Sequence, residues 1–287
     1  LVQATESGGG CGEHWPRCQG SIIPSIGNAH TAVEFTHRIV TSILSVSFIV
    51  MVIGARKLYG RGHLVWRTAL WSTGFLILEI FLGAALVLFG WVEADASWGR
   101  VVADGLHVIN TFMLVGSVAL VAHFAGGNSG FRINPTAKRD RYLLAAVAIL
   151  ITIAVRGTLN SLADTLYFSD AVNVDETPTA ALLVNIRGIH PALAIGGGTI
   201  IFYLVHRAAA HATGTTEKLA LTIQGVIGLQ FLVGIFNIVL LTPLETQIIH
   251  LTLADALWLL LLIFSAHTLA TPTLEEPRPV EEVTTVG

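Results

Sequence analysis

Seven stretches of predominantly apolar residues follow one another along the chain, with short polar segments between them. They cover residues 29–55, 68–90, 101–124, 142–160, 182–206, 218–241 and 246–268. A helix of about 20 apolar residues spans the ~30 Å hydrocarbon core of a bilayer. The alternating pattern of a membrane barrel is absent, and unpaired backbone groups are costly in lipid. The pattern therefore predicts an all-α, polytopic membrane protein with seven visible spans.

The composition supports this class. Of 287 residues, 53% are hydrophobic and 12% are charged, with a mean hydropathy of +0.70. Soluble domains carry about 25% charged residues. The net charge of −3 gives no indication of nucleic-acid binding. Membrane lipid is therefore the expected environment.

The basic residues predict the orientation. They are concentrated in the loops after the first, third and fifth spans: Arg56, Lys57, Arg61 and Arg67; Arg132, Lys138, Arg139 and Arg141; His206, Arg207, His211 and Lys218. Loops rich in Lys and Arg stay in the cytoplasm. The opposite loops carry acidic residues, including Glu93, Asp95, Asp164, Asp170, Asp175 and Glu176. Segment 1–28 is then an extracytoplasmic loop, and segment 269–287 a disordered cytoplasmic tail.

Cys11 and Cys18 are the two cysteines of the chain, and both lie in segment 1–28. A location on the oxidising side of the membrane favours a disulfide. Such a bond is either a structural staple or a redox-active pair, because a short exposed loop can hold a reducible disulfide. A zinc site with His14 is a weaker alternative, since no fourth ligand is suitably spaced.

Four histidines lie within the first two or three turns of alternate spans: His37, His107, His190 and His250. Histidine pairs from facing helices are a common way for a bundle to hold a cofactor. Zinc and copper normally recruit further Cys, Asp or Glu ligands, and a proton relay needs carboxylates at several depths. Axial ligation of heme needs only two histidines and a large apolar groove. The pattern favours bis-histidine heme sites near the outer surface, with structural or other-metal roles as alternatives.

An internal repeat relates the two halves of the chain. Glu79 and Gly83 in the second span have the same spacing as Gln230 and Gly234 in the sixth, within similar apolar sequences. Such repeats are common in polytopic membrane proteins. The first half lacks a counterpart of the fourth span, so we expect an eighth helix before Leu1. The expected fold is then two pseudo-symmetric four-helix bundles, with residues 29–124 and 142–268 as the visible halves and 125–141 as a cytoplasmic linker.

The residue three positions before the first histidine of each pair differs between the halves. An offset of three places two side chains on one helix face, so we expect Glu34 beside His37 and Arg187 beside His190. Arginine can pair with heme propionates, whereas a carboxylate suits chemistry at the bound molecule. Alternatively, Glu34 caps the start of its helix. Arg156 is either a second propionate partner or a side chain that reaches the outer interface, and the latter is the preferred interpretation.

Together these residues resemble the heme A synthases of aerobic respiratory chains. The resemblance covers essentially the whole chain. It rests on Thr5-Glu6-Ser7-Gly8 with Cys11-Gly12 and Trp15-Pro16-Arg17-Cys18, Glu34-Phe35-Thr36-His37-Arg38, Leu106-His107-Val108-Ile109-Asn110-Thr111, Arg187-Gly188-Ile189-His190-Pro191, and His250-Leu251-Thr252-Leu253-Ala254-Asp255 with Trp258.

The resemblance implies an enzyme of the cell membrane that oxidises a ring methyl of heme O to a formyl group, giving heme A. Successive hydroxylations, with water as the final leaving group, are implied. It further implies that His190 and His250 hold a resident heme b, that His37 and His107 flank the substrate heme, and that Glu34 is catalytic. The implied partners are the heme O synthase and the terminal oxidase that receives heme A. The competing hypothesis is a cytochrome b-type electron carrier, although such carriers usually stack hemes toward opposite membrane faces.

Two features depart from the family pattern. The segment between Asp164 and Ala181 has no cysteine pair, which confines any thiol chemistry to Cys11 and Cys18. Pro191 follows His190 where Arg38 follows His37, and we expect the proline to kink that helix at the ligand.

Overall fold

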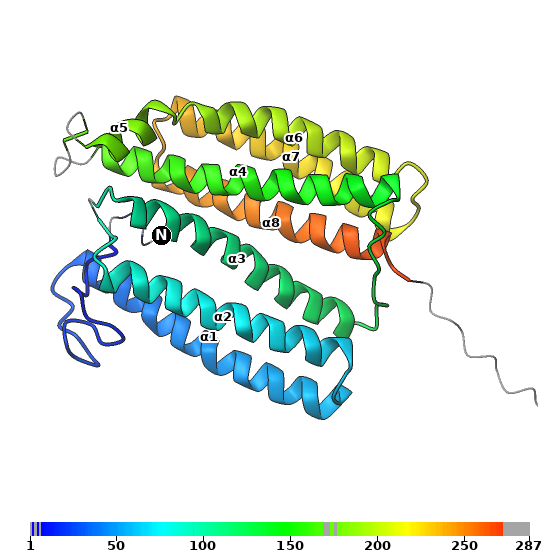
Figure 1. The fold of residues 1–287 in the computed structure, drawn as a ribbon, viewed down its shortest axis with the longest axis horizontal. Helices are drawn as coiled ribbons and strands as arrows, with labels where there is room; N and C mark the ends of the chain where they lie inside the picture. Colours follow the sequence, from blue (N-terminus) through cyan, green and yellow to red (C-terminus); the bar gives the residue numbers. More distant parts are fainter. Residues whose placement is uncertain are drawn as a thin grey trace, which may run out of the picture.

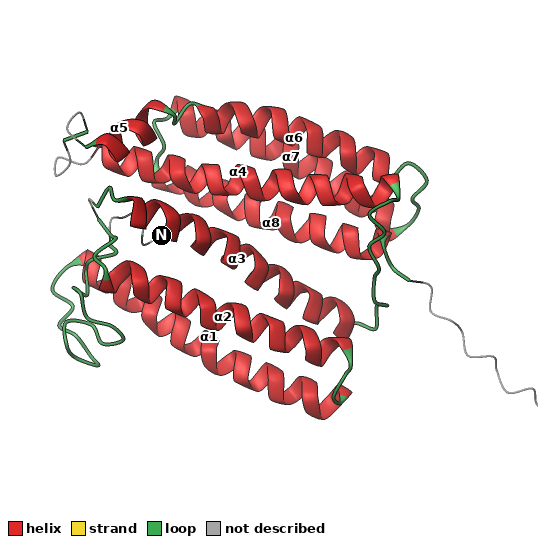
Figure 2. Ribbon diagram, in the orientation of Figure 1, coloured by secondary structure: helices red, strands yellow, loops and turns green. Residues whose placement is uncertain are grey.

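The computed structural model describes Val2, Thr5 and residues 7–93, 95–168, 173–174 and 177–271. Within these residues the regular secondary structure is entirely α-helical (Figure 2). Glu6 of the N-terminal motif, the loop residues Asp170, Asp175 and Glu176, and residues 272–287 of the predicted tail 269–287 lie outside the described residues. The prediction of disorder is wrong for the start of that tail, because Leu269 and Thr271 are hydrogen-bonded through their backbones to Arg132 and Gly130 of the linker.

Seven of the described helices are long and apolar enough to cross a membrane: α1 (Ala29–Tyr59), α2 (Leu64–Leu88), α3 (Trp98–Ala125), α4 (Lys138–Phe168), α6 (Ile189–Ala208), α7 (Thr215–Val239) and α8 (Leu244–Thr268). A shorter helix, α5 (Pro178–Asn185), precedes α6. Many large apolar side chains on these helices point away from the protein, among them Ile43, Trp71 and Leu229. Contiguous apolar surface of this kind is suited to lipid rather than water. The predicted all-α, multi-pass membrane fold is confirmed.

The helices form two groups (Figure 1). In the first, α2 packs against both α1 and α3; in the second, α4 packs against α6 and α8, and α7 packs against α6 and α8. The groups meet where α3 contacts α4 and α8. Helices α1, α3, α6 and α8 all begin at the end of the molecule that carries the N-terminal segment (Figure 1). That arrangement brings the starts of the four histidine-bearing helices to one end of the protein.

Trp258 of α8 joins the two groups. Its indole Nε1 donates a hydrogen bond to the carbonyl of Phe112 on α3 at 2.8 Å, and the two rings stack with centroids 5.3 Å apart. Gly116, one turn along α3, lies under the indole: a Cβ there would be 3.0 Å from the Trp258 ring. The close approach of α3 to α8 therefore depends on a residue without a side chain.

The predicted span 182–206 is not a single helix. A turn at 186–188 separates α5 from α6. Pro191 has no N–H to donate to the carbonyl of Arg187, which instead accepts from the backbone N–H of His190 at 3.3 Å. The expected kink at Pro191 is wrong, because the proline lies in the first turn of α6, where no helical donor is required. Arg187 lies in this turn and not in a helix, and its predicted place beside His190 stays a prediction.

Candidate functional site

Three helices bring polar side chains together in the first group. His37 on α1 lies close enough to His107 on α3 to interact with it electrostatically, and Glu79 on α2 lies within the same range. The Oε2 atom of Glu79 is 3.6 Å from Nδ1 of His107. His107 and Glu79 are half-buried, whereas His37 is exposed. The two histidines that the sequence paired are thus neighbours on separate helices.

The second group contains an equivalent arrangement. His190 on α6 interacts electrostatically with His250 on α8 and with Arg156 on α4. Gln230 on α7 completes the set, with its Nε2 atom 3.3 Å from Nε2 of His250. Both histidines are half-buried. All four long helices of this group therefore contribute a polar residue to one place.

Two glycines make room for the imidazoles of the second pair. A Cβ on Gly157 of α4 would lie 3.0 Å from Cε1 of His190, and one on Gly234 of α7 would lie 3.5 Å from Cε1 of His250. The first separation is shorter than ordinary van der Waals contact, so a side chain at Gly157 would displace the ring. Here the sequence provides space for the ring of His190.

The donor set fits heme better than a directly bound metal ion. The Nδ1 atoms of His107, His190 and His250 are buried and have no hydrogen-bond partner within the described part of the chain. A buried polar atom without a partner costs about 1–3 kcal/mol, so these rings are suited to a ligand that binds one ring nitrogen and turns the other toward a polar neighbour. The described residues hold no cluster of three or more His, Cys, Asp and Glu side chains arranged around a common point. Axial ligation by two histidines satisfies this chemistry.

Cys11 and Cys18 form a disulfide. The predicted bond is therefore confirmed. The alternative zinc site with His14 is wrong, because zinc requires free thiolates.

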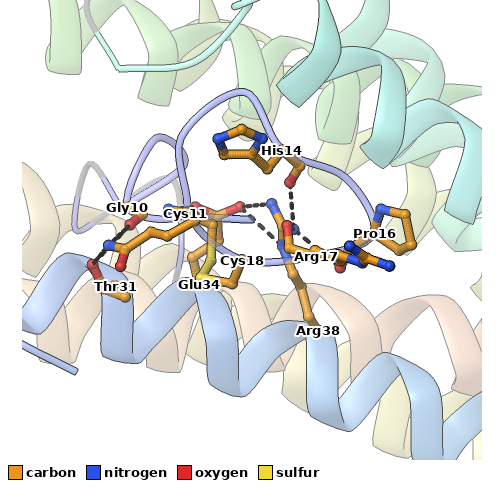
Figure 3. A network of polar contacts seen from close by, with 10 residues as sticks. Gly10, Cys11, His14, Pro16, Arg17, Cys18, Thr31, Glu34 and Arg38 are labelled. Carbon is orange, nitrogen blue, oxygen red and sulfur yellow. Dashed lines mark hydrogen bonds and ion pairs between the residues drawn. A yellow bond between two sulfur atoms is a disulfide. The ribbon is translucent and has the colours of Figure 1, made fainter. Parts of the chain in front are cut away.

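Glu34 of α1 holds the segment that contains the disulfide (Figure 3). Its side chain is buried, with 3% of the residue exposed, and Oε2 accepts a hydrogen bond from the backbone N–H of Cys11 at 2.6 Å. Its Oε1 atom is paired with the guanidinium of Arg38. Arg38 also donates to the carbonyls of His14 and Arg17, each at 2.7 Å. One acid and one base thus fasten the disulfide segment to the start of α1.

The alternative explanation of Glu34 as a helix cap is wrong. Asn28 is the N-cap of α1, and its side-chain oxygen accepts from the backbone N–H of Thr31 at 2.8 Å. The Oγ1 atom of Thr31 then donates to the carbonyl of Gly10 at 2.7 Å (Figure 3). The helix start is satisfied without Glu34, whose buried carboxylate needs another explanation.

The two arginines lie around the turn before His190. The guanidinium of Arg187 stacks over the ring of Tyr167, 4.4 Å from its centroid. Arg156 donates from Nη2 to the carbonyl of Ile186 at 2.9 Å. Arg156 therefore braces the α5–α6 turn, a role that the sequence did not indicate.

Glu79 and Gln230 are functional candidates that the sequence indicated as markers of the repeat and as polar residues that should face the bundle interior, but not as partners of the histidines. The structure places each of them against the second histidine of its own half. The internal repeat could have indicated them, because Glu79 and Gln230 occupy equivalent positions on the helices that precede those of His107 and His250. What the sequence could not give was the rotation of the helices that turns these positions toward the rings.

The fold and the paired histidines define a multi-pass, all-α membrane protein with two sites suited to heme. The chain belongs to the COX15-CtaA family, described as cytochrome oxidase assembly proteins, whose model matches residues 1–262. The resemblance to heme A synthases is thereby confirmed at the level of the family.

Similar proteins carry two different names. A protoheme IX farnesyltransferase from Thermus thermophilus is 33% identical over 273 residues, which cover 93% of this chain and 45% of that protein. The chain thus spans less than half the length of that relative. Heme A synthases from Lysinibacillus sphaericus and Bacillus licheniformis are 39% and 40% identical over 90 residues, about 31% of this chain and 29% and 30% of theirs. No solved structure matches the chain.

Proposed function

We propose that the protein is a heme A synthase, a membrane oxidoreductase that converts a ring methyl of heme O into a formyl group. One observation carries the proposal: equivalent helices of two related halves each supply a histidine pair, and a buried carboxylate, Glu34, lies one turn from the first pair alone. Two equivalent sites suit two hemes, and the chemical difference between them suits a substrate and a resident cofactor.

In this proposal His37 and His107 hold heme O in the N-terminal half. Glu34 is the catalytic residue, and acts as a proton acceptor or as a fixed negative charge at the reacting methyl. A carboxylate is suited to this task because it stabilises developing positive charge and accepts protons. Its pairing with Arg38 orients it before substrate binds.

His190 and His250 would hold the resident heme b. The support for this fit is that their Nδ1 atoms have no hydrogen-bond partner among the described residues and that Gly157 leaves space for the ring of His190. When bound, this heme supplies one-electron redox chemistry at its iron. Arg187 and Arg156 are the proposed partners of its propionates. A guanidinium stacked on a ring, as Arg187 is on Tyr167, keeps its edge N–H groups available for a carboxylate.

We further infer that the protein lies in the cell membrane with the disulfide segment outside and the C-terminal tail in the cytoplasm. The basic loops after α1, α3 and α6 support this orientation through the positive-inside rule. The proposed partners are the heme O synthase that supplies the substrate and the terminal oxidase that receives heme A.

A second candidate is farnesyl transfer to heme, the activity in the name of the Thermus relative. Transfer from an isoprenoid diphosphate requires Mg²⁺, which is normally held by carboxylates together with the phosphates. The described residues offer no acidic cluster of that kind, and paired intramembrane histidines have no role in such chemistry. The donor set therefore favours oxidation of heme over its prenylation.

Product analysis of the purified full chain separates the candidates. One sample receives heme O with a reductant and air, and a second receives heme b with farnesyl diphosphate and Mg²⁺. Our proposal predicts heme A in the first and no heme O in the second. Formation of heme O in the second sample supports the transferase, whereas unchanged hemes in both samples support a cytochrome b-type electron carrier.

A further inference from the structure

Glu79 is tied to α3 by contacts that fix its carboxylate. It accepts hydrogen bonds from Nδ2 of Asn110 at 2.6 Å and from the hydroxyl of Thr111. Asn110 is in turn anchored by a second bond, from Nδ2 to the carbonyl of Phe75 at 2.9 Å. The carboxylate therefore has a defined position on α2, and its Oε2 atom lies 3.6 Å from Nδ1 of His107.

The distance of 3.6 Å is an electrostatic contact and too long for a hydrogen bond. The Nδ1 atom is buried and has no hydrogen-bond partner among the described residues. A closer approach of about 0.4 Å would give a hydrogen bond. A metal bound at Nε2 would limit the turning of the ring, and Nδ1 would then remain beside the carboxylate.

The equivalent position in the other half has a different chemistry. Gln230 donates from Nε2 to the backbone carbonyl of His250 at 3.1 Å, and the same amide nitrogen lies 3.3 Å from Nε2 of the His250 ring, whereas Glu79 lies beside Nδ1 of His107. An amide is neutral, whereas the Glu79 carboxylate carries a full charge. A carboxylate that accepts the Nδ1–H of a ligating histidine fixes its tautomer and makes the other nitrogen a stronger electron donor. The amide nitrogen of Gln230 faces Nε2 of His250 and does not accept from Nδ1, so it has no effect of this kind.

We propose that Glu79 is a positioning residue that holds His107 with Nδ1–H toward Oε2 and Nε2 toward the iron of the substrate heme. The consequence is an electronic difference between the halves: the heme at His107 has the more electron-rich axial ligand and therefore the more negative midpoint potential. The inference rests on the proposed function, in which His107 ligates heme O, but it concerns a residue outside the two histidine pairs.

The variant Glu79→Gln tests the inference in the full-length protein. Protein containing heme b is titrated with heme O, and the affinity and midpoint potential of each heme are measured by absorption spectroscopy. We expect Glu79→Gln to weaken heme O binding about tenfold. We also expect it to favour the ferrous state of that heme about tenfold, equivalent to about 59 mV for one electron. The heme b potential should be unchanged.

Asn110→Ala keeps the charge of Glu79 and the hydrogen bond from Thr111 but removes one of the bonds that fix the carboxylate. We expect it to shift the heme O potential less than Glu79→Gln does, and an equal shift would assign the effect to the α2–α3 contact and overturn the inference. An unchanged heme O potential in Glu79→Gln would overturn the inference. If that variant does not fold, Glu79→Asp, which draws the carboxylate away from Nδ1, is measured instead, and an unchanged heme O potential in it would overturn the inference. Failure of the unsubstituted protein to bind heme O, or its normal binding by His107→Ala, contradicts the proposed function instead.

Discussion

The carboxylate of Glu34 accepts a hydrogen bond from the backbone N–H of Cys11 at 2.6 Å. A buried acid one turn from His37 is thereby linked directly to the disulfide segment. The same side chain is thus placed to take part in chemistry at the first histidine pair and to hold the segment that covers the start of α1. Substitution can separate these two roles.

Glu34→Gln keeps an oxygen that can accept from Cys11 but removes the charge and the ion pair with Arg38. If the charge is what the reaction uses, conversion of heme O should fall about 10²-fold or more, the usual contribution of a positioned acid or base. The heme b content should stay the same, because His190 and His250 are in the other half. The measurement is heme A formed per bound heme b. Loss of heme b with retained activity would show that the halves are assigned the wrong way round.

Arg38→Ala tests the holding role. It removes the bonds to the carbonyls of His14 and Arg17, each worth about 1 kcal/mol of local stability. Hydrogen exchange of residues 9–20 should become faster, with little change in exchange of α2 and α3. Arg17→Ala is the matched control, since it removes a neighbouring guanidinium but leaves the backbone carbonyl that Arg38 binds. Equal exchange rates in both variants would contradict this role of Arg38.

Gly157→Val should expel the resident heme. The added Cβ would lie 3.0 Å from Cε1 of His190, and the ring must move to avoid the branched side chain. A substitution that disturbs the position of a metal-ligating side chain typically weakens metal binding about tenfold or more. Gly196→Val on α6 is the control, because no atom lies within 4 Å of its added Cβ. The heme b content per protein is the measurement, and similar values for both variants would count against His190 as a ligand.

Gly116→Leu should destabilise the contact between the two helix groups. The new side chain would collide with Trp258, whose ring lies 3.0 Å from the position of the added Cβ, and overpacking of this kind costs about 1–3 kcal/mol. Gly74→Leu on α2 has open space around it and should leave stability almost unchanged. Thermal unfolding in detergent measures both. A melting temperature of Gly116→Leu equal to that of Gly74→Leu would contradict the close contact of α3 with α8.

The long helices could be predicted from the sequence because lipid imposes length and hydropathy directly. The division of residues 182–206 between α5 and α6 could not be predicted, because an apolar stretch does not indicate where one helix ends and the next begins. Pro191 indicated that the helix is disturbed, but the predicted kink at His190 is not what the structure shows. The missing backbone N–H instead permits a turn that includes Arg187. The missing N–H of proline predicted a disturbance of the helix near residue 191, whereas the tertiary structure determines that this disturbance is a turn between α5 and α6.

The candidate site could likewise be predicted only in part from the sequence. Spacing along the chain was enough to select the four histidines, because equivalent depth in alternate spans is a property of sequence. The bond between Glu34 and Cys11 joins residues 23 positions apart and depends on how the disulfide segment folds back over α1. The contact of Glu79 with His107 depends on the rotation of α2 against α3. Neither relationship follows from periodicity within a single helix.

The most direct test of the two-heme account is the identity and amount of heme in purified protein carrying His190→Ala, compared with His37→Ala. Extracted hemes can be separated and measured against the protein concentration. We predict that His190→Ala loses heme b and its visible absorption, whereas His37→Ala keeps heme b but no longer converts heme O. Full heme b occupancy in His190→Ala, with an unchanged spectrum, would contradict the assignment of His190 and His250 as its ligands.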